Sequence, residues 1–175
     1  MTIHSRFKPF NFEQWVKDNQ DYLKPPVNNS IVWEDADMMV MIIGGPNSRY
    51  DFHVDPVEEF FYQLKGNMYL DTVQDGEHKK VEIREGEVLL LPSNVPHSPQ
   101  RPEEGSIGLV VEPKRPVGAK DAFEWYCLEC GDKVHRVELI LNSIVDDLPP
   151  AFEAFYSDTA ARTCANCGTL HPGKK

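Results

Sequence analysis

The chain has 175 residues, of which 41% are hydrophobic and 26% charged, so it is long enough to form one soluble domain with its own hydrophobic core. The 18 basic and 28 acidic residues give a formal net charge of −10, and no run of basic residues is longer than two. Such a surface repels phosphate backbones and anionic lipids. Nucleic acids and membranes are therefore not expected as partners.

The sequence shows no targeting or membrane-spanning segment. No stretch approaches the roughly 20 apolar residues that a spanning helix needs, and the first six residues, MTIHSR, lack the apolar core of a signal peptide. We therefore expect a cytoplasmic protein. The four cysteines form two close pairs late in the chain. In a reducing compartment such pairs indicate a metal site before they indicate disulfides.

The first part of the chain predicts a helix. Asn11 suits the N-cap, and Gln14 suits the reciprocal position of a capping box. Pro25 and Pro26 are expected to end the helix. The apolar residues between them follow helical spacing: Phe12, Trp15, Val16, Tyr22 and Leu23.

The central part of the chain predicts β structure. Residues 74–77, Gln-Asp-Gly-Glu, form a strong hairpin-turn sequence, and Glu85-Gly86 predicts a second reversal. Because no long helix separates the central runs, the pattern favours an antiparallel sandwich or a jelly-roll barrel over a parallel α/β sheet. The seven predicted strands are Ile31–Trp33, Met38–Ile43, Phe60–Leu64, Met68–Val73, Val81–Ile83, Val88–Leu91 and Ile107–Val111.

The composition changes after residue 112. Residues 113–118, Pro-Lys-Arg-Pro-Val-Gly, are typical of a connector, and the cysteine pairs follow it. We predict a barrel unit with the N-terminal helix over residues 1–112 and a linker with a small four-cysteine unit over 113–175. In the second unit we expect a short helix around Glu138 to Asp147, which Pro149-Pro150 would end, and another over Phe152 to Tyr156.

Three residues of the strand region form a candidate metal site. His53 is followed six residues later by Glu59, and His97 lies beyond the next turn-rich stretch. Two imidazoles and one carboxylate fill one face of an octahedral ion and leave the opposite positions open for a bidentate substrate and dioxygen, as in non-haem Fe(II) oxygenases. A barrel suits this set, because neighbouring strands direct side chains into one interior.

The sequence around these ligands resembles the two short motifs of the cupin superfamily. The first frame runs from His53 through Glu59 to Gly66, and the second runs from Gly86 through Pro92 to His97. The histidines outside these frames are interpreted as ordinary surface or core residues: His4, His78, His135 and His171.

Two positions depart from the cupin pattern. Asp55 stands where many cupins have another histidine, and Asn94 stands where the second motif usually has glycine. A three-histidine site is therefore not expected, although Asp55 or Glu58 is chemically able to replace a ligand.

Three further residues are candidates for substrate binding. Arg49 precedes His53 by four residues, and Arg101 follows His97 by four. In so acidic a chain they suggest a local anion site, because a guanidinium binds a carboxylate through two parallel hydrogen bonds; ion pairs with acids at the barrel mouth are the alternative. Glu112 ends an apolar strand, where it either faces inward to contact a ligand hydroxyl or is simply a polar strand end.

Longer segments carry a more specific resemblance. They are residues 23–28 (LKPPVN), 44–47 (GGPN) with Arg49, 58–63 (EEFFYQ), 91–92 (LP), 96–99 (PHSP) with Arg101, 125–127 (WYC) and the last cysteine pair. Over nearly its whole length the chain resembles the 3-hydroxyanthranilate 3,4-dioxygenase family. The resemblance implies a cupin double-stranded β-helix, a jelly-roll barrel, with an N-terminal helix, a small rubredoxin-like C-terminal metal-binding appendage and assembly as a homodimer.

The resemblance also implies roles for the site residues. Fe(II) would be chelated by the amino and hydroxyl groups of 3-hydroxyanthranilate, and O₂ would take the remaining position. Insertion of both oxygen atoms would open the ring to 2-amino-3-carboxymuconate semialdehyde, which cyclises to quinolinate for NAD biosynthesis. The iron ligands would be His53, Glu59 and His97, the carboxylate would be held by Arg49 and Arg101, and the hydroxyl would contact Glu112.

The cysteines predict a second metal site. Cys127 and Cys130, like Cys164 and Cys167, form a Cys-x-x-Cys-Gly loop. Four thiolates make a closed tetrahedral site for zinc or iron, and the family resemblance points to iron. Without an open coordination position, this site is expected to be structural.

Two other functions compete with the dioxygenase. A cupin without oxygenase activity would use the same metal to bind or isomerise a small polar ligand such as a sugar, and a regulatory module would use the cysteine site for a partner. Arg49 and Arg101 favour an aromatic acid over a neutral sugar. The nearby apolar residues either line a slot for an aromatic ligand or fill the barrel, and core packing is the preferred interpretation for each: Val27, Ile43, Phe60, Tyr62 and Leu91.

Overall fold

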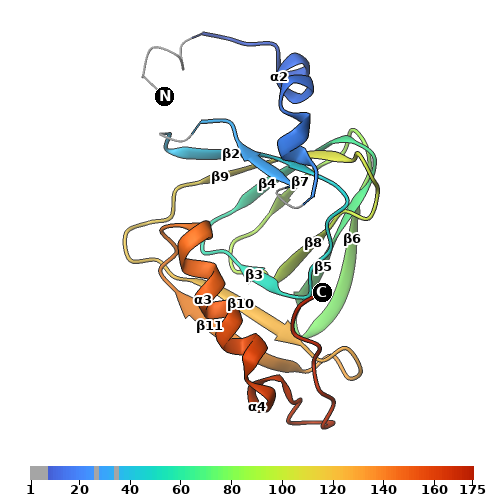
Figure 1. The fold of residues 1–175 in the computed structure, drawn as a ribbon, viewed down its shortest axis with the longest axis vertical. Coiled ribbons are helices and arrows are strands. Elements are labelled where there is room, and N and C mark those ends of the chain that lie inside the picture. The colour runs from blue at the N-terminus through green and yellow to red at the C-terminus, as the bar shows by residue number, and fades with distance from the viewer. Residues whose placement is uncertain (1–7, 26–27, 34–35) are drawn as a thin grey trace.

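Two antiparallel sheets form the two layers of the protein (Figure 1). The computed structural model describes residues 8–25, 28–33 and 36–175, so the predictions that concern His4, Pro26 and Val27 lie outside the described residues. Among the described residues, no helix has the length and apolarity needed to span a bilayer.

The first sheet has five strands in the order β1-β2-β9-β4-β7, and the second has six in the order β11-β10-β3-β8-β5-β6. Neighbours in each sheet pair antiparallel, which confirms the predicted strand direction. The strands of the first sheet are β1 (Asn29–Ile31), β2 (Met38–Gly44), β4 (Glu59–Lys65), β7 (Val88–Leu91) and β9 (Ile107–Pro113). Those of the second are β3 (Phe52–Val54), β5 (Met68–Gln74), β6 (Glu77–Ile83), β8 (His97–Gln100), β10 (Asp121–Tyr126) and β11 (Lys133–Leu139).

The barrel core lies between the two sheets. Phe61 and Val110 from the first sheet pack with Met68, Leu70 and Ile83 from the second, and all five are buried. Burial of such side chains contributes about 1.5–3 kcal/mol each. The fold class predicted from the sequence, a mainly β jelly-roll arrangement with an N-terminal helix and a four-cysteine cluster near the C-terminus, is confirmed.

The predicted hairpin between β5 and β6 is present. Asp75 and Gly76 both have positive φ, 54° and 80°, which is the backbone of the tight turns that join antiparallel strands. Gly86 also reverses the chain, with φ 83°. That turn, however, connects β6 in one sheet to β7 in the other, so it makes no hairpin.

The N-terminal helix is shorter than predicted. Helix α2 (Phe12–Asp18) begins as expected, because the Asn11 side chain accepts a hydrogen bond from the Gln14 backbone N–H at 2.8 Å. The Gln14 side chain does not complete the capping box and donates to Asp18 instead. The chain then continues as the 3₁₀ helix η1 (Gln20–Leu23).

Strand prediction succeeded for the apolar runs and failed for mixed ones. Six of the seven predicted runs lie within observed strands, whereas the run Ile31–Trp33 overlaps β1 only at Ile31. Strands β3, β8, β10 and β11 had not been predicted. Strand β3 is only three residues long, β8 consists mostly of polar residues, and β10 is buried along its whole length, so none of the three forms an apolar run of the kind that predicts a strand.

The predictions for the C-terminal helices were right in part, because Phe152–Tyr156 is helical as expected. Residues expected to begin a helix near Glu138 belong to β11, and a single helix, α3 (Ile144–Ser157), contains both Pro149 and Pro150 as well as the segment Phe152–Tyr156. A proline keeps a helical φ and removes one backbone hydrogen bond. Packing of the helix against the sheet offsets this loss, since Phe155 stacks on Trp125 with ring centroids 4.3 Å apart.

The segment after residue 112 shares a sheet with the barrel. Strand β10 pairs with β3, and Phe123 lies opposite His53 in this register. Helix α3 and the short α4 (Thr159–Arg162) follow β11 (Figure 1). Whether residues 1–112 and 113–175 are separate folding units stays a prediction, but their strands are joined by hydrogen bonds.

Helix α3 should depend on Phe155 for its attachment. Phe155 is 1% exposed, and replacing a buried phenylalanine with alanine costs about 3–5 kcal/mol. We expect Phe155→Ala to lower the free energy of unfolding by that amount in urea denaturation. Phe10→Ala, at a residue that is 42% exposed, is the matched control and should change it by less than about 1 kcal/mol. Equal effects would contradict this packing role.

Candidate functional site

A cavity of about 160 Å³ between the sheets contains the predicted triad. His53 comes from β3, Glu59 from the start of β4 and His97 from the start of β8. Where β3 pairs with β8, His53 lies directly opposite His97. Each of the three residues offers one ligand atom, and these atoms lie within 4.8 Å of one another.

The geometry of the triad fits a metal ion. Glu59 Oε1 lies 2.9 Å from His97 Nε2 and 3.8 Å from His53 Nδ1. This oxygen is buried and, among the described residues, has no partner with hydrogen-bond geometry. The other nitrogen of His97, Nδ1, lies 2.9 Å from the Val95 carbonyl, which directs Nε2 toward Glu59. A bound cation between the two imidazoles and this oxygen would satisfy it.

The electrostatics of the triad agree with its geometry. Burial lowers the pKa of His53 despite its contact with Asp121, so that imidazole is neutral at neutral pH. Burial acts to raise the pKa of Glu59, but the two histidines outweigh it and the pKa lies below its usual value. The Glu59 carboxylate likewise outweighs burial at His97 and raises the pKa of that imidazole, so a proton there occupies the place a metal would take.

A second layer of residues orients His53, and the sequence did not reveal it. His53 Nε2 lies 2.8 Å from Asp121 Oδ1, and Arg115 Nε is 2.9 Å from each Asp121 oxygen. The ring of Phe123 stacks on His53 with centroids 4.9 Å apart. Asp121 begins β10 and Arg115 lies in the predicted connector, where no ligand-like spacing marked either residue.

The three predicted substrate residues occupy different positions. Arg49 and Glu112 line the triad cavity. Arg49 pairs with Asp51, and Glu112 is buried and accepts a hydrogen bond from Arg115 at 2.7 Å.

Arg101 is buried and does not line the triad cavity. Its Nη1 donates to Gln63 Oε1 at 2.6 Å. Gly108 makes room for the guanidinium, because a Cβ there would lie 2.4 Å from Nη2 of Arg101. Within the described part of the chain no acid pairs with this cation, and burial lowers its pKa to about 10.

The apolar neighbours divide between the two sides of the first sheet. Leu91 belongs to the core and Ile43 packs against it, as predicted, and Ile43 also lines the cavity. Phe60 and Tyr62 are 37% and 36% exposed, so their interpretation as barrel core was wrong. They alternate along β4 with the buried Phe61 and point to the opposite side.

Comparison with known proteins identifies the family. The family model described as 3-hydroxyanthranilic acid dioxygenase matches residues 4–156. A curated 3-hydroxyanthranilate 3,4-dioxygenase from Ruegeria pomeroyi is 62% identical over 171 residues, covering 98% of this chain and 95% of that protein. One from Burkholderia cenocepacia is 58% identical over 168 residues, covering 96% and 95%. The chain belongs to the 3-hydroxyanthranilic acid dioxygenase family.

Solved structures resemble this member of the 3-hydroxyanthranilic acid dioxygenase family more distantly. A cupin-2 domain containing protein from Shewanella frigidimarina aligns with a TM-score of 0.48 at 17% identity, covering 65% of this chain and 100% of that one.

The four cysteines of this family member meet in space. Cys127 Sγ lies 3.5 Å from Cys167 Sγ, and Cys130 Sγ lies 3.6 Å from Cys164 Sγ. Metal–sulfur bonds of about 2.3 Å place tetrahedral thiolates about 3.8 Å apart, close to these distances. The two loops are built alike, since Gly131 and Gly168 each donate a backbone hydrogen bond to the first cysteine of their pair. The cluster is therefore suited to hold one metal ion.

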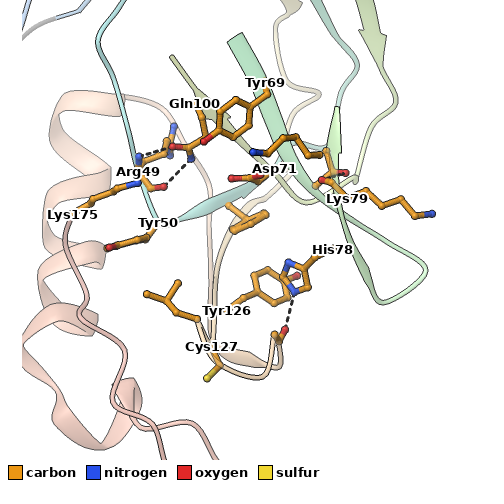
Figure 2. A pocket seen from close by; sticks show the side chains of 15 residues that line it. Arg49, Tyr50, Tyr69, Asp71, His78, Lys79, Gln100, Tyr126, Cys127 and Lys175 are labelled. Atoms are coloured by element: carbon orange, nitrogen blue, oxygen red, sulfur yellow. Dashed lines mark hydrogen bonds between the residues drawn. The ribbon is translucent and has the colours of Figure 1, made fainter. Parts of the chain in front are cut away.

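A larger cavity lies away from the triad. It measures about 540 Å³ and is bordered by the β5–β6 hairpin, the first cysteine loop and Lys175 (Figure 2). His78 reaches across it to the Gly131 carbonyl at 2.8 Å. Its walls include Arg49 but no triad residue, and Phe52 alternates along β3 with His53 and so faces the other way. The smaller cavity is therefore the candidate active site.

Asp121 should control metal affinity through His53. Loss of such an outer carboxylate typically weakens metal binding 10–100-fold, so we expect Asp121→Asn to raise the Fe(II) dissociation constant by about that factor. Asp75→Asn, in the exposed β5–β6 turn, is the control and should bind Fe(II) like the parent. An unchanged dissociation constant for Asp121→Asn would show that the contact does not orient a ligand.

Proposed function

We propose that this chain is a 3-hydroxyanthranilate 3,4-dioxygenase in which His53, Glu59 and His97 hold the catalytic metal as Fe(II). One observation carries the proposal: in a chain of this family, the three ligand atoms lie within 4.8 Å of one another around a buried carboxylate oxygen that lacks a hydrogen bond among the described residues. Two histidines and one carboxylate are the donor set of Fe(II) oxygenases with open positions.

The bound iron would supply open coordination positions for the substrate and O₂ and a route around the spin barrier to their direct reaction. The chain itself orients the ring. Arg49 lines the cavity and can meet the substrate carboxylate, and Glu112 faces the same space to accept a hydrogen bond from the hydroxyl. Holding both reactants in contact accounts for much of the rate enhancement in such a site.

Arg101 supports the choice of an anionic substrate. Its guanidinium is buried, its Nε lacks a hydrogen-bond partner among the described residues, and its Nη1 contacts only an uncharged amide. A buried cation without an anion is costly. We infer that Arg101 turns from Gln63 toward the carboxylate of 3-hydroxyanthranilate and that the resulting ion pair contributes to its affinity.

The proposal extends to the pathway, the assembly and the second metal. The product, 2-amino-3-carboxymuconate semialdehyde, cyclises to quinolinate, which places the enzyme in tryptophan degradation and NAD biosynthesis. We further propose a cytoplasmic homodimer whose second metal, iron or zinc, is held by Cys127, Cys130, Cys164 and Cys167.

Anaerobic reconstitution tests the function directly. The purified protein is loaded with Fe(II), mixed with 3-hydroxyanthranilate and then exposed to O₂ while oxygen consumption and the absorbance of the ring-opened product are followed. We expect one O₂ consumed per substrate. Folded, iron-loaded protein that consumes no oxygen would contradict the proposal and favour a cupin that only binds or isomerises its ligand.

Metal binding and substrate binding should separate by mutation. We expect His97→Ala to lose the triad metal. Arg101→Ala should keep the metal but raise KM about 10–100-fold, because the substrate loses a charge-assisted hydrogen-bond pair. Metal analysis and steady-state kinetics measure the two effects. Arg84→Ala, at an exposed arginine, is the control for Arg101→Ala. Loss of the metal in folded Arg101→Ala would contradict this division of roles.

The cysteine site should act on stability alone. We expect Cys127→Ser and Cys164→Ser to lose the second metal and to unfold at a lower temperature, because a closed metal site contributes to folding. Turnover per folded, Fe(II)-loaded molecule should stay at the parent value. A fully folded variant that has lost turnover would show that this site takes part in the reaction.

A further inference from the structure

Arg115 connects the metal site to three acids. It lies just after β9, and its side chain is 12% exposed. Nη1 donates to Glu112 Oε1 at 2.7 Å, Nη2 donates to Asp55 Oδ2 at 2.7 Å, and Nε is 2.9 Å from each oxygen of Asp121. The planar guanidinium is suited to this task, because its donors point in fixed directions.

Asp55 lies next to two members of the triad, Glu59 and His53. Its carboxylate forms one potential metal-binding group with Glu59 and Glu112 and another with His53 and Asp121, each with ligand atoms within 4.8 Å of one another. Asp55 Oδ2 lies 3.9 Å from His53 Nε2. The chain thus holds a further carboxylate beside a site that needs only three ligands.

Both oxygens of Asp55 are already engaged. Oδ1 accepts a hydrogen bond from the Val57 backbone N–H at 3.0 Å, and Oδ2 accepts one from Arg115. If Arg115 were removed, Oδ2 would become a buried acceptor without its partner beside a divalent cation. Coordination to that cation is then the favourable outcome, since a buried carboxylate needs either a hydrogen bond or a counter-charge.

We propose that Arg115 is a positioning residue that keeps Asp55 from coordinating the triad metal and so keeps coordination positions open for a chelating substrate. The inference rests on the proposed metal at His53, Glu59 and His97. An added carboxylate ligand would occupy a position that the substrate needs, and its negative charge would weaken the metal as an acceptor for the substrate hydroxyl. Substrate affinity therefore depends on a residue that binds neither the metal nor the substrate.

Cobalt(II) makes the coordination visible without turnover. The parent, Arg115→Gln and the double variant Arg115→Gln/Asp55→Asn are loaded with Co(II), and their visible absorption, which responds to coordination number, is recorded anaerobically. 3-Hydroxyanthranilate is then titrated into each protein. Lys114→Gln, at the exposed neighbouring residue, is the matched control.

We expect Arg115→Gln to bind Co(II) with an altered spectrum and to bind 3-hydroxyanthranilate at least about tenfold more weakly, within the range for outer-layer residues of metal sites. The double variant should recover the parent spectrum and most of the affinity, because the amide that replaces the Asp55 carboxylate carries no charge to compete for the metal. Arg115→Lys should bind 3-hydroxyanthranilate with an affinity between those of Arg115→Gln and the double variant, since one ammonium cannot reach three carboxylates.

Two results would overturn the inference. In one, Arg115→Gln keeps the parent spectrum and substrate affinity. In the other, its spectrum changes but Asp55→Asn restores nothing, so that Arg115 acts only on Glu112, on Asp121 or on folding. A parent protein that binds no Co(II) at the triad, as judged against His97→Ala, would instead contradict the proposed function.

Discussion

Buried negative charge is the constraint on which the site depends. Four carboxylates, Asp55, Glu59, Glu112 and Asp121, line or border one interior space, and none is more than 5% exposed. One guanidinium, that of Arg115, pairs with three of them, so the ionised carboxylates carry more negative charge than this cation offsets. Burial raises the pKa of Asp55 to about 7 and raises that of Glu112 as well, which shows how strongly this interior resists further negative charge. A divalent cation bound between Glu59 and the two histidines would offset that charge.

The two sheets divide the work of building this interior. Sheet pairing places His53 against His97, and β4 of the facing sheet supplies Glu59. The segment after β9 then completes the site: Arg115 and Asp121 fix the outer contacts, Phe123 stacks on His53, and Leu148 of α3 adds to the cavity wall. Residues that looked like a connector and an appendage therefore help to form the cavity of the candidate active site, while the four cysteines form their own cluster.

The sequence indicated the candidate triad better than its surroundings, for a physical reason. His53, Glu59 and His97 stand in motif frames whose glycines and prolines fix strands and turns locally, so spacing alone indicates them. Arg115 and Asp121 are brought to His53 by the pairing of β10 with β3, across 68 positions in the case of Asp121, and no local pattern records such a contact. The same holds for Pro149 and Pro150, whose helix is stabilised by distant packing on Trp125. The spacing from His97 indicated Arg101, but nothing in the sequence indicated its hydrogen bond to Gln63.

The most direct test is X-ray absorption at the iron edge of the anaerobic Fe(II) protein, measured with and without bound 3-hydroxyanthranilate. The Cys164→Ser variant is used, so that only the iron at the triad contributes to the spectrum. The structure predicts two imidazole ligands and one protein carboxylate in both states, with the substrate replacing water when it binds. A second protein carboxylate at the iron, or an iron environment that does not change when the substrate is added, would contradict a metal site whose remaining positions are open to the substrate.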